Sequence, residues 1–290
     1  MNIYEAQQRL IFQLYDVYDH REAANIADMV MEHLTGWKKI DRILNKQVSL
    51  LPGKIELLDK YATQLLAHKP VQYVLNEAWF YGLKLFVNQH VLIPRPETEE
   101  LVEWILHDRK TGTNATSAPD PVVILDIGAG SGCISIALKK NLPHADVFAC
   151  DISKDALIIA QKNALDNEAD IALLHLDFLD QQQWPHLPFV DVIVSNPPYV
   201  PLGDKKTMRP NVLEFEPHLA LFVEDDDPLI FYRSISMFAT QRLNPNGSIF
   251  MEVHEGLAQD VQSLFTANGY SQIEIRKDMQ GRDRMIRVTR

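Results

Sequence analysis

The sequence contains little of what secreted, membrane-spanning or metal-stabilised proteins are built from. Its two cysteines, Cys133 and Cys150, have neither a CxxC nor a zinc-ligand spacing, so we expect no disulfide scaffold and a reducing compartment. No apolar run reaches the ~18 residues of a transmembrane helix, and the opening Met1–Ala6 lacks the basic and then apolar order of a signal peptide. These absences favour a cytoplasmic protein that does not enter a membrane.

Patterns of several common functional sites are also missing. The 10 histidines are scattered without an H-x-x-x-H spacing, so we expect no metal site. No Gly-x-Ser-x-Gly elbow is present, which leaves serine hydrolysis without support. Negatively charged residues outnumber positively charged ones, because the sequence has 28 Lys and Arg but 39 Asp and Glu, which gives a net charge of −11. Non-specific affinity for nucleic acid comes mainly from neutralised phosphates, so we expect no direct binding to nucleic acid.

Helical periodicity dominates the first quarter of the 290-residue chain. Apolar residues recur at helical spacing in three stretches, residues 3–17, 23–34 and 55–65. Gly36 and Lys69-Pro70 act as stop signals after the second and third stretches. We expect a helical bundle over residues 1–75.

A change of pattern marks the segment 76–95. Polarity alternates over residues 83–87, and Asn88-Gln89 can turn the chain into residues 90–93, which predicts a β-hairpin between two domains. Pro94-Arg95-Pro96 ends this strand structure. The carboxylates of residues 97–100 then suit the start of a helix, which we expect to run to about Arg109.

Apolar runs alternate with helical stripes through most of residues 96–290. Strands are expected at residues 122–127, 145–150, 171–176, 190–195, 248–253, 273–276 and 285–289, and helices at 132–141, 154–167, 229–243 and 257–268. Residues 111–120 suggest a loop, and Asn244 to Gly247 suggest a turn before the fifth strand. The alternation predicts an α/β domain with a parallel sheet and helices on both faces. The last two strands are too close for a parallel crossover, so we expect them to pair antiparallel.

A glycine-rich loop follows the first of these strands. It comprises Asp126, Ile127, Gly128, Ala129, Gly130, Ser131 and Gly132. In a doubly wound sheet such a turn lies at the carboxyl ends of the strands, where ligands bind, and glycines let the backbone approach a ligand closely. Cys133 stands where a dinucleotide fingerprint needs a glycine, which weighs against NAD.

Acidic residues end the next two strands. Asp151 ends the second strand, 23 residues after Gly128, where a carboxylate can accept hydrogen bonds from both ribose hydroxyls of an adenosine ligand. Asp151 also precedes a helix, so its other reading is a helix cap. Asp177 and Phe178 end the third strand, where the adenine would lie. We therefore expect an adenosine-containing ligand.

The fourth strand ends abruptly at Asn196-Pro197-Pro198-Tyr199. Two prolines make a rigid wall because each fixes φ and donates no hydrogen bond. The Asn196 side-chain carbonyl and the Pro197 backbone carbonyl can both accept hydrogens from one NH₂ group, and the Tyr199 ring can stack on a planar amide or base. An isolated Asn-Pro turn that merely stops a strand is common. Here the motif follows the glycine loop and Asp151 in the chain, and this order favours methyl transfer to a planar nitrogen. Orientation of that nitrogen and polarisation of its N–H bonds would assist the transfer.

Nearly the whole chain resembles the HemK/PrmC family of protein-(glutamine-N5) methyltransferases. The matching segments are Pro70-Val71-Gln72-Tyr73, Val91 to Glu99, Asp126 to Gly132, Asp151, Asn196 to Tyr199, Glu216-Pro217 with Ala220-Leu221, and Asp278 with Gly281 to Arg284. Three positions depart from the pattern: Asn76 replaces a glycine, Phe178 a frequent Trp, and the acidic run 224–227 a more glycine-rich stretch.

The resemblance implies a helical N-terminal domain that docks the substrate and a seven-stranded class I methyltransferase domain with its last strand antiparallel. It implies S-adenosyl-L-methionine as methyl donor, S-adenosyl-L-homocysteine as product, and as target the glutamine of the Gly-Gly-Gln motif in class I peptide chain release factors. Asn196 and the two prolines would bind the substrate amide. A monomer is expected.

Some residues keep two interpretations. Arg95 lies between two prolines and either contacts the cofactor carboxylate or the substrate, or is a surface arginine. Residues 200–227 are long for a connection and suggest a lid, while Glu252 fits a structural acceptor. Two other functions stay open: DNA adenine-N6 methylation, which the charge of −11 disfavours, and a non-catalytic adenosine-binding scaffold, which does not need Asn196 to Tyr199.

Overall fold

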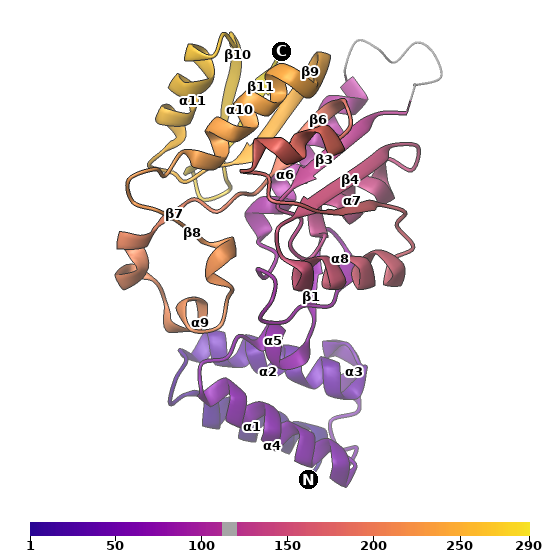
Figure 1. Ribbon diagram of the computed structural model, residues 1–290. Helices are drawn as coiled ribbons and strands as arrows, with labels where there is room; N and C mark the ends of the chain where they lie inside the picture. The colour runs from indigo at the N-terminus through magenta and orange to yellow at the C-terminus, as the bar shows by residue number, and fades with distance from the viewer. Residues whose placement is uncertain (112–120) are drawn as a thin grey trace. The chain divides into compact units, whose positions relative to one another are not determined.

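The computed structural model describes residues 1–111 and 121–290. The chain divides into two compact units (Figure 1). Unit 1 contains Met1–Glu77 and Arg209–Phe215, and unit 2 contains Ala78–Met208 and Glu216–Arg290. The loop expected at residues 111–120 falls almost wholly on residues 112–120, which lie outside the described part of the chain.

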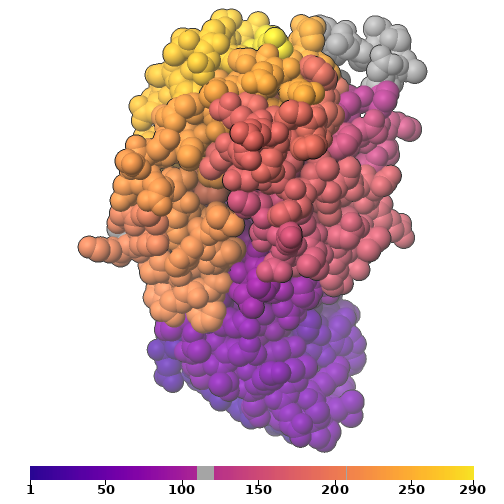
Figure 2. All heavy atoms as spheres, in the orientation of Figure 1, coloured from indigo at the N-terminus to yellow at the C-terminus, as the bar shows by residue number. Residues whose placement is uncertain are grey.

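Unit 1 is helical. It contains α1 (Ile3–Leu14), α2 (His20–Thr35), α3 (Lys39–Leu44), α4 (Pro52–Leu66), α5 (Val71–Leu75) and the short α9 (Pro210–Leu213). Asn2 and Glu5 form a reciprocal capping box at the start of α1, and Gly36 ends α2 in the left-handed conformation with φ 71°. The apolar stripes of α1, α2, α4 and α5 form one buried cluster. Figure 2 shows the outer surface of the N-terminal helices in indigo to purple.

Asn76 ends α5 in the left-handed conformation, with φ 54° and ψ 39°. Asparagine is one of the few residues other than glycine that adopt this conformation readily. The replacement of the family's usual glycine therefore leaves this turn intact.

The β-hairpin differs from the one expected. Strand β1 (Ala78–Phe80) pairs antiparallel with β2 (Leu83–Leu85), and Tyr81 and Gly82 make the turn with φ values of 49° and 75°. Two positive φ angles suit the tight turn that matches strand twist. The expected pairing of residues 83–87 with 90–93 is wrong, because both backbone groups of Phe86 are hydrogen-bonded to the Asn163 side chain instead.

Unit 2 is built on a seven-stranded sheet in the order β10-β11-β9-β6-β3-β4-β5. The strands are β3 (Val123–Ile127), β4 (Asp146–Asp151), β5 (Ala172–His175), β6 (Val190–Ser195), β9 (Leu243–Glu252), β10 (Gln272–Lys277) and β11 (Asp283–Thr289). Strands β5, β4, β3, β6 and β9 run parallel, and β11 is antiparallel to both of its neighbours. The expected α/β fold with an antiparallel last strand is confirmed.

Helices cover both faces of this sheet (Figure 1). Side chains of α6 (Pro96–Thr111), α7 (Cys133–Asn141) and α8 (Lys154–Asp166) join one buried cluster. Side chains of α10 (Ile230–Arg242) and α11 (Ala258–Ala267) join a second cluster on the other face. This layering leaves the carboxyl ends of the parallel strands as the place for a ligand.

The expected turn at Asn244–Gly247 lies inside β9 rather than before it. Val190 pairs with Leu243 and Val192 pairs with Ser248, so β9 carries extra residues in a bulge against β6. Asn246 has φ 64° there, and the Asn244 side chain donates to Asp191 Oδ1 at 2.9 Å. Because β9 pairs with β6 on both sides of the bulge, at Leu243 and again from Ser248, the segment between them belongs to the strand.

Several short elements connect the main ones. They are η1 (Gln181–His186), β7 (Val200–Pro201), η2 (Leu202–Thr207), η3 (His218–Ala220) and β8 (Phe222–Val223). Strands β7 and β8 pair in parallel and so join the two ends of the segment 200–223. Among the described helices, none is both long and apolar enough to cross a membrane.

Candidate active site

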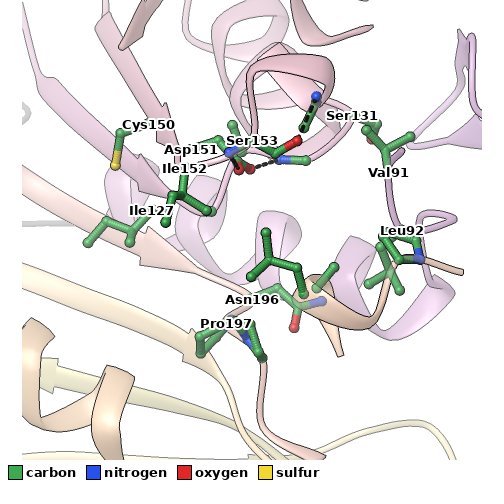
Figure 3. A pocket seen from close by; sticks show the side chains of 18 of the residues that line it. Val91, Leu92, Ile127, Ser131, Cys150, Asp151, Ile152, Ser153, Asn196 and Pro197 are labelled. Carbon is green, nitrogen blue, oxygen red and sulfur yellow. Dashed lines mark hydrogen bonds between the residues drawn. The ribbon is translucent and has the colours of Figure 1, made fainter. Parts of the chain in front are cut away.

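A cavity opens at the carboxyl ends of β3, β4 and β6 in unit 2. Its lining includes Ile127 to Ser131 of the glycine loop, Asp151 and the first three residues of the Asn-Pro-Pro-Tyr motif. In Figure 3, Asp151 and Ser131 lie on one side of the cavity and Asn196 and Pro197 on the opposite side. Elements predicted separately from the sequence therefore share one site.

The glycine loop is held in a conformation that requires glycine. Gly128, Gly130 and Gly132 have φ values of 82°, 53° and 79°. A Cβ added at Gly128 or Gly130 would meet no atom within 4 Å, whereas one at Gly132 would lie 3.1 Å from Ile136 Cδ1. The first two glycines thus leave room at the cavity wall, and Gly132 permits close helix packing.

Asp151 ends β4 and holds the loop in place. Its Oδ2 accepts the Gly130 N–H at 2.9 Å, and its Oδ1 accepts the Ser153 N–H at 2.8 Å. Burial raises the pKa of this carboxyl, although the same hydrogen bonds oppose the shift. Each carboxylate oxygen has further lone pairs, so the group fits the two hydroxyls of a ribose. The helix-cap interpretation is wrong, because Ser153 caps α8 with its own hydroxyl, which accepts the Ala156 N–H at 3.1 Å. Asp151 instead supports the glycine loop, and its role as a ribose acceptor stays a prediction.

Asp177 and Phe178 also line the cavity. They follow β5, whose last residue is His175. Asp177 Oδ1 accepts the Leu179 N–H at 2.9 Å, and the Phe178 carbonyl accepts from the Trp184 indole at 2.9 Å. The Phe178 ring packs edge-on against Phe238 with a centroid distance of 5.3 Å. Phe178 is thus a fixed apolar wall whose ring belongs partly to the core.

Asp126 and Gly132 lie behind the cavity wall, and neither is among its described lining residues. Asp126 is fully buried and accepts hydrogen bonds from the Ser135 backbone N–H, at 3.2 Å, and from the Ser135 hydroxyl. Burial raises its pKa to about 7. Its Oδ1 has no partner within the described residues. Asp126 therefore anchors the start of α7 and shapes the loop from behind.

Tyr199 is the one residue of the Asn196–Tyr199 motif that is not among the described lining residues. Its hydroxyl donates to Glu252 Oε1 at 2.9 Å, and its ring lies 6.0 Å from the His254 ring. Burial and the neighbouring carboxylate raise the Tyr199 pKa. Glu252 is thus an acceptor, as its position at the end of β9 indicated.

Thr98 is a site residue that sequence reasoning missed. It lies in the first turn of α6 and is 2% exposed. Its hydroxyl donates to Glu252 Oε2 at 2.7 Å and accepts from Asn196 Nδ2 at 3.2 Å. The only sequence signal was its place within the segment from Val91 to Glu99. Nothing local indicates that this helix start meets Asn196, 98 residues further along.

Arg95 lines the cavity, and its guanidinium is paired with Glu216. Arg95 Nη2 lies 2.6 Å from Glu216 Oε1, and the Glu216 side chain is 1% exposed. Pro217, Leu219 and Ala220, which follow Glu216, line the cavity as well.

Across residues 1–111 and 121–290, no three His, Cys, Asp or Glu side chains group closely enough to hold a metal ion.

Comparisons with known proteins agree with this architecture. Residues 5–75 match the family described as PrmC N-terminal domain, and residues 115–213 match the methyltransferase small domain. The solved structure titled human methyltransferase 10 domain containing protein is 17% identical, has a TM-score of 0.50, and is covered to 89% by 72% of this chain. At this identity it indicates the methyltransferase fold alone.

Two curated relatives extend over nearly the full length. A release factor glutamine methyltransferase of Flavobacterium psychrophilum is 42% identical over 99% of this chain and 99% of its own. One of Bacteroides thetaiotaomicron with the same name is 38% identical over 96% of both chains. These relatives do not favour the DNA-methylating or scaffold alternatives. The chain therefore belongs to the release factor glutamine methyltransferase family and is an S-adenosylmethionine-dependent methyltransferase.

Proposed function

We propose that this enzyme transfers a methyl group from S-adenosyl-L-methionine to the side-chain amide nitrogen (N5) of the glutamine in the Gly-Gly-Gln motif of class I peptide chain release factors. The observation that carries the proposal is a single cavity whose lining contains Ile127 to Ser131 and Asp151 as well as Asn196 to Pro198. A methyl donor and a planar amide can meet there. The names of the curated relatives support the glutamine target.

The residues around the cavity fit the methyl donor. Asp151 would accept from its ribose hydroxyls, and Gly128 to Ser131 would approach it with their backbone. Asp177 and Phe178 would border the adenine, while Asp126 and Gly132 would act by shaping the loop. When bound, the donor supplies a methyl group on a positively charged sulfur.

Asn196, Pro197, Pro198 and Tyr199 form the proposed catalytic set. The Asn196 side-chain carbonyl and the Pro197 backbone carbonyl would each accept one N–H of the glutamine amide. An amide nitrogen is a poor nucleophile because its lone pair is delocalised, so orientation and polarisation of its N–H bonds provide the help. Pro198 would stiffen the wall. Tyr199 is held by its hydrogen bond to Glu252, and its ring would stack on the planar substrate amide. Arg95 would border the substrate while paired with Glu216.

The domain roles follow the same proposal. Residues 1–75 would dock the release factor, residues 76–95 would link the domains, and residues 96–290 would carry the chemistry. The net charge of −11 supports a protein substrate rather than a nucleic acid. We further propose that the enzyme is a monomer and that it works in the cytoplasm. Light scattering during size-exclusion chromatography of the purified enzyme tests whether it is a monomer.

The deciding experiment uses S-adenosylmethionine carrying a labelled methyl group. The protein is incubated with a class I release factor, with the same factor carrying Gln→Asn in its Gly-Gly-Gln motif, or with duplex DNA. Label is expected on the unchanged factor and on neither of the other two. Label on DNA, or equal label on the Gln→Asn factor, would refute the proposed target.

A further inference from the structure

We infer that Thr98 is a positioning residue whose hydroxyl fixes the rotation of the Asn196 side-chain amide, so that Oδ1 rather than Nδ2 is presented to the substrate nitrogen. The inference rests on the proposed function, because it concerns how the substrate amide is held. It goes beyond that proposal by assigning a task to two residues outside the Asn-Pro-Pro-Tyr motif, Thr98 and Glu252.

The first step is the position of the Thr98 proton. A threonine hydroxyl has one proton to donate, and a carboxylate has none. Glu252 is 2% exposed and receives the Tyr199 hydroxyl on Oε1 and the Thr98 hydroxyl on Oε2. The Tyr232 hydroxyl also donates to the Glu252 backbone carbonyl at 3.1 Å, which fixes the end of β9. Thr98 therefore donates its single hydroxyl proton to Glu252.

The second step is what this leaves for Asn196. With its proton committed, Thr98 Oγ1 can only accept, and the group that faces it must be the Asn196 Nδ2, at 3.2 Å. A flipped amide would place two oxygens against each other with no proton between them. That arrangement forfeits a hydrogen bond at a buried atom, which is unfavourable. The chain Glu252–Thr98–Asn196 thus has one direction.

The third step connects this direction to the substrate. A glutamine NH₂ offers only donors. Within the described residues no group donates to Asn196 Oδ1, so this oxygen is left to accept from the substrate. An amide turned the other way would present its own N–H groups to the substrate N–H groups. The hydrogen bond to Thr98 thereby determines that the Asn196 amide presents its acceptor Oδ1, and not its donor Nδ2, to the substrate NH₂ group.

A purely structural role for Thr98 would depend on its methyl group and its place at the start of α6. Two substitutions separate these roles. Thr98→Val keeps the shape and removes the hydroxyl, and Thr98→Ser keeps the hydroxyl and removes the methyl. Thr266→Val is the matched control, because the exposed Thr266 hydroxyl on α11 bonds only to the Gln262 carbonyl of its own helix among the described residues.

We expect Thr98→Val to lower kcat for methylation of the release factor at least about tenfold, the factor that one lost hydrogen-bond preference supports. Its Kd for S-adenosylhomocysteine and its thermal unfolding midpoint should stay close to those of the wild type. Thr98→Ser should restore kcat to within about threefold of the wild type. Thr266→Val should match the wild type throughout.

Two results would overturn the inference while the proposed function stands. One is a Thr98→Val enzyme with unchanged kcat, and the other is a Thr98→Ser enzyme that loses as much as Thr98→Val. If Thr98→Val lowers stability, Thr98→Ala is compared with Thr98→Ser, since both lack the methyl and only serine keeps the hydroxyl; equal activity of these two contradicts the inference. A wild-type enzyme that does not label the release factor would refute the proposed function itself.

Discussion

Arg95 and Glu216 form an ion pair across 121 residues of sequence, with Nη2 and Oε1 2.6 Å apart. The other oxygen of Glu216 accepts the Ile93 backbone N–H at 3.2 Å. One buried carboxylate therefore joins the segment that precedes α6 to the segment that begins at Pro217. Because both segments line the cavity, this pair fastens two parts of its lining to each other.

Arg95→Met should loosen this part of the lining. Among the described residues, the substitution leaves the buried carboxylate of Glu216 with the Ile93 N–H as its one partner, which costs about 1–3 kcal/mol of unfolding free energy. The Kd for S-adenosylhomocysteine should also rise. Urea unfolding and calorimetric titration check both effects. Arg9→Met is the matched control, because the Arg9–Asp59 pair is exposed and such pairs contribute at most about 1 kcal/mol. Equal effects of the two substitutions would contradict the assigned role.

Asp151→Asn should weaken cofactor binding more than it slows chemistry. An amide side chain has one acceptor atom, so it cannot accept from both Gly130 and Ser153 and also from a ribose. The Kd for S-adenosylhomocysteine is expected to rise at least about tenfold, with kcat at saturating donor much less affected. Titration calorimetry measures the first and initial rates the second. Asp166→Asn, at an exposed position on α8, is the control, and an unchanged Kd for Asp151→Asn would refute the role.

Asn196→Ala should have the opposite profile. It removes the side-chain acceptor for the substrate amide but leaves Asp151 and the glycine loop in place. Loss of one preorganised hydrogen-bonding group lowers kcat by roughly 10²–10³-fold in other enzymes, and a loss of that order is expected here with near-normal binding of S-adenosylhomocysteine. Single-turnover transfer of labelled methyl to the release factor measures it. Full activity of Asn196→Ala would exclude the proposed catalytic role.

The sequence predicted the features whose causes are local. Alternating strands and helices, the glycine loop after the first strand of the sheet, and Asp151 at a strand end all follow from short stretches of chain. Pairing was predicted less well. The hairpin turn lies at Tyr81-Gly82 because Asn163 binds Phe86, 77 residues away, and no short pattern indicates that contact.

The polar network at the site was hidden for the same reason. Thr98 and Asn196 are separated by 98 residues, and Tyr199 and Glu252 by 53. Each pair meets only because the start of α6 and the end of β9 reach the same edge of the sheet. The motif indicated methyl transfer to a planar nitrogen, while the fold determines which atom of the Asn196 side chain is left to accept a hydrogen bond from that nitrogen.

Asp126 makes stability depend on pH in a direction that can be measured. Its folded pKa of about 7 lies above the usual value of 3.8, because burial disfavours the charged form. The stability it contributes is therefore fully present below pH ~4 and is lost as the pH rises through ~7. The loss amounts to about 4 kcal/mol at most.

Asp126→Asn removes this titration while it keeps an oxygen that can accept from Ser135. The wild type should therefore lose more stability than Asp126→Asn between pH 5 and pH 8, as measured by thermal unfolding at both values. Asp180→Asn is the control. Hydrogen bonds from the Gln183 side chain and the Gln182 backbone lower the pKa of Asp180, so its stability contribution changes only as the pH falls below ~4. A difference between the wild type and Asp126→Asn that is the same at pH 5 and pH 8 would contradict a folded pKa of about 7 for Asp126.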